Sequence, residues 1–276
     1  MGALFGPFCP PLCLDGLEVV FHCPCDVARR YRGAEVTLRG NNTIHSALCI
    51  ELAHVYSTLV PRVLPPLFPE FVWRGSGQSV HLTFDDGPHP EWTPFVLDEL
   101  GRRGHKGTFF CLGKNILKYP KVFDRIRSEG HAWGNHTMQH ESGWSTPNRA
   151  YLRSYLECEA LTQSGLFRPP YGRIKLAQAK AIATRSQLVM WTVLSGDFDI
   201  RRRPDQCLKD TLRAMRPGSI AVMHESAKAG PRLAHVLPGV LDFLDAREWR
   251  SEAMSMRART ASEESHSRTL FLGPSL

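Results

Sequence analysis

From residue 80 to residue 247 the sequence alternates short apolar runs with longer segments whose apolar residues recur at helical spacing. Short apolar runs are typical of buried β-strands, and apolar residues three and four positions apart form one face of an α-helix. Because parallel strands need long, usually helical, crossover connections, this alternation predicts a parallel sheet. The predicted strands cover residues 80–84, 107–112, 131–135, 166–168, 188–193 and 219–223, with a seventh near 249–254.

The segments that follow these strands carry the helical pattern. Thr93 and Pro94 predict a helix start, because a Thr side chain can accept a backbone hydrogen bond there and proline fits the first helical position. Strand–helix units of this kind either close into a barrel or form an open, doubly wound sheet, and we favour the barrel. Further helices are predicted over residues 116–130, 149–164, 174–184 and 237–247, and from Pro204.

Composition narrows the class of protein. The 276 residues are 42% hydrophobic and 22% charged, which is ordinary for a globular protein. The net charge of +7 comes from scattered arginines without a basic stripe interleaved with aromatics, so we expect no nucleic-acid partner. No apolar run approaches the roughly 18 residues that a transmembrane helix needs. Residues 1–26 have no basic residue before their apolar portion, unlike a signal peptide, so a cytoplasmic location is the default expectation.

Two segments fall outside the strand–helix pattern. Residues 1–54 crowd Cys, Pro and Arg together, and we expect either an extension or a biological start near Val55. Residues 257–276 are polar and aperiodic, as in disordered tails. The catalytic domain is therefore expected over residues 55–256. The spacing of the N-terminal cysteines matches no usual zinc finger, so reduced thiols are expected at Cys9, Cys13, Cys23 and Cys25.

Two adjacent carboxylates stand where the first predicted strand ends. Asp85 and Asp86 follow the apolar run, and Gly87 with Pro88 interrupts the strand. Successive side chains of a strand point to opposite faces, but at an interrupted end both can reach the same edge of the sheet. One carboxylate could then hold a metal while the other acts as a base. The same residues also form common turns, which is the ordinary alternative.

His136 and His140 add nitrogen ligands to this pair. A spacing of four places two imidazoles on one face of a helix, where both can bind one cation. With Asp86 they make two nitrogen ligands and one carboxylate, a set that leaves positions open for water and substrate and is typical of catalytic zinc. Such a pair also occurs by chance in a chain with 12 histidines, so the carboxylates are needed for the interpretation.

Three more polar side chains end predicted strands. Arg168 precedes a Pro-Pro-Tyr-Gly turn, Asp197 follows the run at 188–193, and His224 follows the run at 219–223. Each has an ordinary alternative, respectively a surface loop, a helix cap and a satisfied core histidine. Active sites of parallel α/β proteins lie at the carboxyl ends of the strands, so the five groups together favour a catalytic site.

On these motifs the chain resembles the NodB-homology polysaccharide deacetylases, also called carbohydrate esterase family four, and most of all bacterial members of uncharacterised substrate. Phe198 stands where the family commonly has Trp, and Glu225 where it has Asp. We expect both departures to affect substrate contacts rather than the chemistry. The five motifs occur in family order as Thr-Phe-Asp-Asp-Gly-Pro at 83–88, His-Thr-Met-Gln-His at 136–140, Arg-Pro-Pro-Tyr at 168–171, Asp-Phe-Asp-Ile-Arg at 197–201 and Val-Met-His-Glu at 222–225.

The resemblance implies a deformed (β/α)7 TIM-like barrel and removal of N-acetyl groups from an acetylated amino-sugar polymer or oligomer. It also implies a divalent metal, with Zn²⁺ expected and Co²⁺ as the alternative. The metal ligands carried over from the family are Asp86, His136 and His140. Tyr171 and Trp191 are expected to offer aromatic faces to a sugar ring, with core packing as the alternative.

The catalytic roles also come from the resemblance. Asp85 is implied as the base that takes a proton from water, with Arg168 holding its carboxylate. His224 is implied as the acid that protonates the leaving amine, supported by Asp197. The backbone N–H of Tyr171 is implied as a contact for the oxyanion.

Two other functions stay open at this point. Proteins of this fold could instead hydrolyse a formamido sugar or a ureide with the same metal site. A sugar-binding protein without catalysis is the other alternative. Loss of Asp85, a metal ligand or His224 would favour it, and all of these residues are present. The expected partner is an N-acetylated glycan, and the sequence leaves the oligomeric state open.

Overall fold

The computed structural model describes residues 65–75 and 77–255. The predicted extension over 1–54, the predicted tail over 257–276 and the four N-terminal cysteines lie outside these residues, so their predictions stand untested. None of the helices in the described ranges combines the length and the apolar character needed to cross a bilayer.

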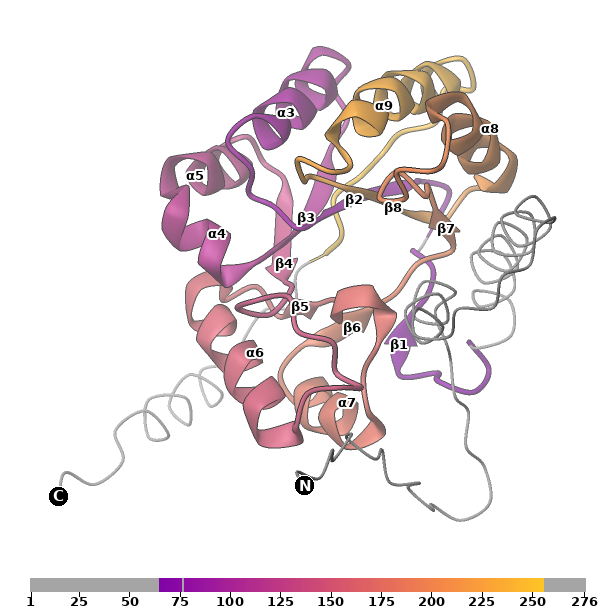
Figure 1. Ribbon diagram of the computed structural model, residues 1–276. Helices are drawn as coiled ribbons and strands as arrows, with labels where there is room; N and C mark the ends of the chain where they lie inside the picture. Colours follow the sequence, from indigo (N-terminus) through magenta and orange to yellow (C-terminus); the bar gives the residue numbers. More distant parts are fainter. Residues whose placement is uncertain (1–64, 76, 256–276) are drawn as a thin grey trace, which may run out of the picture. The chain divides into compact units, whose positions relative to one another are not determined.

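The centre of the fold is one sheet in which every strand pairing is parallel. Its strand order is β1-β6-β5-β4-β3-β2-β8-β7, and the sheet curls into an open half-barrel (Figure 1). The α/β barrel-like class expected from the strand–helix alternation is therefore confirmed. The strands are β1 Phe71–Val72, β2 His81–Asp85, β3 Gly107–Cys111, β4 Ala132–Asn135, β5 Leu166–Phe167, β6 Gln187–Val189, β7 Val193–Leu194 and β8 Ile220–His224.

Helices cover the outer side of this curled sheet (Figure 1). Every residue of β2 and β3 is buried, as expected for strands covered on both faces. In the core the rings of Phe84 and Phe109 stack with centroids 5.1 Å apart. The helices are α3 Trp92–Arg102, α4 Gly113–Lys118, α5 Pro120–Ser128, α6 Asn148–Thr162, α7 Leu176–Ala183, α8 Pro204–Ala214 and α9 Gly230–Asp245, and a short 3-10 turn, η1, covers Pro170–Gly172.

Three predicted elements differ in detail from the structure. The predicted helix over 116–130 is two helices that meet at Tyr119, because Pro120 lacks an N–H and restricts the residue before it. The predicted strand over 188–193 is also two strands, since β6 pairs with β1 and β5 whereas β7 pairs with β8. The predicted cap at Thr93 is wrong, because α3 begins at Trp92, two residues before the expected first helical residue Pro94, and Glu91 occupies the cap position.

The two ends of the domain depart further from the prediction. The strand predicted near 249–254 is reduced to a single parallel bridge between Val80 and Ser251. Strand β1 was not predicted, because two residues are too few to show a period. The described sheet consequently has eight strands where seven were expected, but the carboxyl ends of its central strands still meet at one edge.

Candidate active site

The sequence-predicted site residues gather at the carboxyl edge of the sheet. Asp85 is the last residue of β2 and His224 the last residue of β8, and these two residues are direct neighbours in the β2–β8 register. His136 follows β4, and Arg168 follows β5. Since all the strands are parallel, their carboxyl ends place these side chains together, as the strand–helix pattern predicted.

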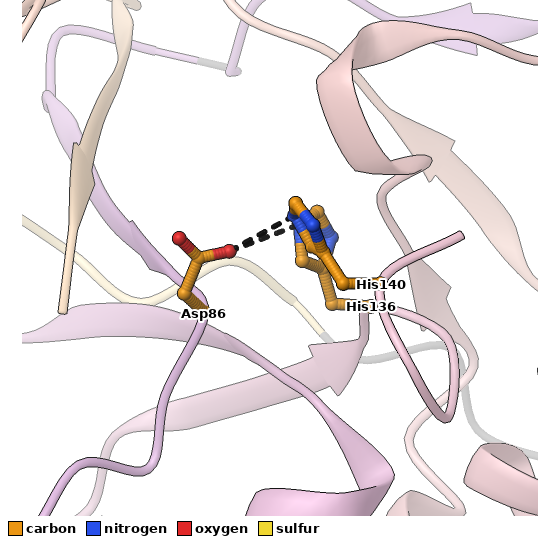
Figure 2. Close-up of side chains that lie close together, drawn as sticks. All are labelled: Asp86, His136 and His140. Carbon is orange, nitrogen blue, oxygen red and sulfur yellow. Dashed lines mark ion pairs between the residues drawn. The ribbon is translucent and has the colours of Figure 1, made fainter. Parts of the chain in front are cut away.

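Asp86, His136 and His140 converge on one point (Figure 2). Their ligand atoms all lie within 4.8 Å of one another. The Oδ1 atom of Asp86 is 3.1 Å from Nε2 of His140 and 3.8 Å from Nε2 of His136. Oδ1 is buried and receives no properly directed hydrogen bond from any described group. The three ligand atoms thus converge on a common position, which fits a shared cation.

The geometry that joins the two histidines is not the predicted one. No helix contains His136 and His140; they lie in a loop after β4, with Thr137 at φ 68° and His140 at φ 71°. Hydrogen bonds inside the loop hold this shape. The Asn135 Oδ1 accepts from the Thr137 N–H at 2.8 Å, and the Thr137 Oγ1 accepts from the His140 N–H at 3.0 Å. The expected pairing of imidazoles is present, but the helical reason for it is wrong.

Each histidine of this site has a partner on its other ring nitrogen. Nδ1 of His136 lies 2.8 Å from the Arg168 carbonyl, which can only accept, so Nδ1 carries the proton and Nε2 offers its lone pair. Burial lowers the pKa of His136 to about 4, which keeps the ring neutral near pH 7. Nδ1 of His140 lies 3.1 Å from the Tyr171 hydroxyl. Neutral, oriented imidazoles are the form that binds a metal.

The carboxylate of Asp86 is ionised in this environment. Burial acts to raise its pKa, but the neighbouring His140, His224 and His136 outweigh burial and hold the pKa well below its usual range. An ionised carboxylate beside the neutral imidazole of His136 and the imidazole of His140 is a suitable donor set for a divalent cation such as Zn²⁺.

Asp85 forms a buried ion pair with Arg168, at 2.7 Å between Oδ1 and Nη1. The Arg168 side chain has no exposed surface. It also donates to the Thr83 hydroxyl at 2.7 Å and to the backbone carbonyls of Val189 and Met190 at 3.2 and 3.0 Å. These bonds fix the guanidinium and, through it, the carboxylate of Asp85. The predicted pairing is present.

His224 is paired with Asp197. The His224 Nδ1 is 2.8 Å from Oδ1 of Asp197, and the other carboxylate oxygen accepts from the His224 backbone N–H at 2.8 Å. Burial acts to lower the pKa of His224, but the attraction of Asp197 outweighs it and raises the pKa to about 9. The ring of Phe198 packs edge-on against the imidazole at 5.1 Å. His224 is therefore an imidazolium near neutral pH.

The two aromatic residues differ in exposure. Tyr171, in η1, is 55% exposed and is available to a ligand. Trp191 is 5% exposed, and its ring packs so closely on Gly172 that an added Cβ there would lie 2.5 Å from it. Trp191 thus belongs to the core that supports η1, the alternative considered for it from the sequence.

Two residues near the site were missed or misjudged. The Asn115 side chain donates to the Asp86 carbonyl at 2.7 Å, and its place in a short helix gave no sequence signal. Glu225 was expected to affect substrate contacts, but it is fully buried and accepts a hydrogen bond from the Thr93 hydroxyl at 3.0 Å. The buried Glu225 side chain therefore has no exposed surface with which to contact a substrate directly.

The sequence and the fold of this chain are similar to those of known proteins. The sequence profile of the family described as polysaccharide deacetylase matches residues 74–190. A chitooligosaccharide deacetylase of Rhizobium leguminosarum bv. phaseoli is 35% identical over 161 residues, which are 55% of this chain and 70% of that protein. The chain belongs to the polysaccharide deacetylase family.

Peptidoglycan-active relatives are also similar. A peptidoglycan-N-acetylglucosamine deacetylase of Bacillus cereus is 35% identical over 174 residues, and the chain spans 61% of its length. The crystal structure of a peptidoglycan N-acetylglucosamine deacetylase with a bound N-oxidanyl-benzamide superimposes with a TM-score of 0.65 at 28% identity. That match covers 69% of this chain and 95% of the other.

Proposed function

We propose that this protein is a metal-dependent hydrolase that removes N-acetyl groups from an acetylated amino-sugar glycan. The observation that carries the proposal is the convergence of Asp86, His136 and His140. Two further ion pairs lie at the same edge of the sheet, Asp85 with Arg168 and His224 with Asp197. This arrangement combines a cation site, a base and an acid at one edge of the sheet.

Asp86, His136 and His140 would hold the cation, for which we propose Zn²⁺, with Co²⁺ as a substitute. Two nitrogens and one carboxylate leave coordination positions free, as in catalytic zinc sites. A divalent cation at this place would act as a Lewis acid that polarises a carbonyl and makes water more acidic. The buried Oδ1 of Asp86, which lacks a hydrogen bond, supports the assignment.

Asp85 is the proposed general base. It is ion-paired with Arg168 in a region where both side chains are almost fully buried. The pairing fixes the carboxylate at the carboxyl end of β2, where it would accept a proton from water. General bases positioned in this way contribute roughly 10²–10⁴-fold to the rate.

His224 is the proposed general acid. Its pKa of about 9 keeps the proton on the ring at neutral pH, where it can be donated to the leaving amine. Asp197 orients the imidazolium by accepting from Nδ1, so Nε2 is the nitrogen that can deliver the proton. Asp85, paired with Arg168, and His224, paired with Asp197, would thus supply the base and the acid of one reaction.

The relatives support the proposed substrate class. Relatives named for peptidoglycan-N-acetylglucosamine and for chitooligosaccharides support a glycan that contains N-acetylglucosamine. The exposed ring of Tyr171 lies beside His140 and could contact a sugar, and its backbone N–H is the proposed contact for the oxyanion. A formamido sugar or a ureide would be hydrolysed by the same groups and is the second candidate.

The test is incubation of the full chain with Zn²⁺ or Co²⁺ and N-acetylglucosamine oligomers, with assays for acetate and free amine. Acetate release by the wild type is expected, and Asp85→Asn should bind the metal yet lose roughly 10²–10⁴ in kcat. Asp124→Asn, at an exposed aspartate of α5, is the matched control and should keep the wild-type rate. Near-normal turnover by Asp85→Asn would remove Asp85 as the base. Release of formate from a formamido sugar, without acetate release, would favour the second candidate.

A further inference from the structure

The metal ligand Asp86 has a left-handed backbone conformation, with φ at 76°. Residues with a side chain rarely adopt this region, and they remain there only when the surrounding structure imposes it. Asp86 follows the last residue of β2, so its conformation decides where the carboxylate points relative to His136 and His140. The groups that impose the conformation therefore help to define the cation site.

One such group is the side chain of Asn115 in the first turn of α4. Its Nδ2 donates to the Asp86 carbonyl at 2.7 Å. The next carbonyl, that of Gly87, accepts from the backbone N–H of Leu112 at 2.8 Å. Both donors lie at the start of the same short helix, so the two carbonyls after β2 are held from one side.

The start of α4 also holds the loop that carries the histidines. The N–H groups of Gly113 and Lys114 donate to the carbonyls of Thr137 and Met138, both at 3.1 Å. The segment at 112–115 is thus hydrogen-bonded to both ligand-bearing loops. Within this segment Asn115 is the residue that acts on Asp86 through its side chain.

The next residue of the turn, Gly87, is packed against the end of β8. A Cβ atom at Gly87 would lie 2.1 Å from Oε2 of Glu225, so the carboxyl group of Glu225 packs directly on the Gly87 backbone. Glu225 follows β8 and is fully buried. The turn is therefore enclosed between α4 and the end of β8.

We propose that Asn115 is a positioning residue that sets the affinity of the site for its cation by holding Asp86 in the left-handed conformation. This inference rests on the proposed function, which supplies the cation. Without the Asn115 donor the Asp86 carbonyl loses a partner and the backbone can relax, which displaces Oδ1 from its approach to Nε2 of His140. Asn115 does not ligate the cation itself.

The test is calorimetric titration of the metal-free full chain with Zn²⁺, together with the visible absorption spectrum of bound Co²⁺. Asn115→Leu keeps a similar volume without a donor, and Asn115→Asp keeps the shape without the N–H. Both should weaken binding by roughly 10–100-fold, the usual effect of losing a partner of a metal ligand. The Co²⁺ spectrum should also change, because it reports the arrangement of the ligands.

Asn115→Asp separates two explanations. An added negative charge near the site would tighten cation binding if charge alone decided the affinity, whereas loss of the N–H should weaken it. Leu117→Ala, at a residue of α4 that is 60% exposed, is the matched control and should leave the Kd unchanged. An unchanged Kd in Asn115→Leu, or tighter binding by Asn115→Asp, would overturn the inference alone. A wild-type chain that binds neither Zn²⁺ nor Co²⁺ would overturn the proposed metal site as well.

Discussion

His131 and His136 stand at the two ends of strand β4, and their comparison shows what separates a structural histidine from a ligand. Both are buried, and burial lowers the pKa of each to about 4. They differ in their partners. Nδ1 of His131 accepts from the Gly107 N–H at 3.1 Å, so the proton of its neutral ring is on Nε2. Nδ1 of His136 donates to the Arg168 carbonyl, so its Nε2 faces Asp86 with a free lone pair.

His131 and His136 differ in their tautomer and in the edge of the sheet at which they lie, and not in their burial. At the amino end of β4 the imidazole of His131 accepts a backbone hydrogen bond from β3, whereas at the carboxyl end the imidazole of His136 presents an acceptor to the proposed cation site. A search for buried histidines with lowered pKa values would select both residues equally. The partner of Nδ1 is the feature that distinguishes them.

The largest expected effect is on metal binding. His136→Ala should lower the affinity for Zn²⁺ by more than the roughly 10–100-fold expected for loss of an outer partner, because it removes a ligand. His131→Asn should leave the affinity unchanged, since Asn can still accept from the Gly107 N–H. Calorimetric titration of both variants measures the contrast. Equal loss of affinity in the two variants would break the distinction between the ends of β4.

A second prediction extends the comparison to His224, whose partner is a carboxylate. Asp197→Asn removes the charge that raises the pKa of His224 to about 9, so burial should bring the pKa to its ordinary value or below. In the proposed role of His224 as the acid, activity falls as pH rises through its pKa. The alkaline limb of kcat/KM should therefore move down by roughly 2 pH units or more. Profiles of kcat/KM against pH for the wild type and the variant measure this shift.

Asp199→Asn supplies the control for that profile. Asp199 lies two residues further along the same loop, where it pairs with Arg201 at 2.8 Å. Its removal should leave the alkaline limb in place. An alkaline limb that stays fixed in Asp197→Asn would deny His224 the role of the acid.

The smallest effect concerns stability at the amino end. His131 takes up a proton at about pH 6.5 when unfolded but only near pH 4 when folded, so the unfolded state binds more protons between these values. The contribution of His131 to the free energy of unfolding is therefore fully present above pH 6.5 and is lost as pH falls. Between pH 8 and pH 5 this loss amounts to about 2 kcal/mol. Urea unfolding at pH 8 and pH 5 measures the drop in the free energy of unfolding between the two pH values. This drop should be smaller in His131→Asn than in the wild type, by about 2 kcal/mol. Equal losses would show that His131 stays solvated.

The sequence predicted the site better than it predicted the elements around it. Asp85, Arg168 and His224 were placed correctly, because each ends an apolar run and parallel strands bring their carboxyl ends together. His136 and His140 were paired correctly for the wrong reason, since their loop has the spacing of a helix without being one. Asn115 gave no signal, because its role depends on a carbonyl from another part of the chain.

The sequence by itself determined the parallel α/β class and the chemical groups available at the carboxyl edge. The spacing of apolar residues indicates which faces of the strands and helices are buried. The motif residues indicate which chemical groups stand at the ends of the strands. Only the tertiary structure decided the left-handed turn at Asp86, the burial of Trp191 and Glu225, and the tautomer of His136. These features depend on hydrogen bonds and packing between segments far apart in the chain, which local periodicity does not record.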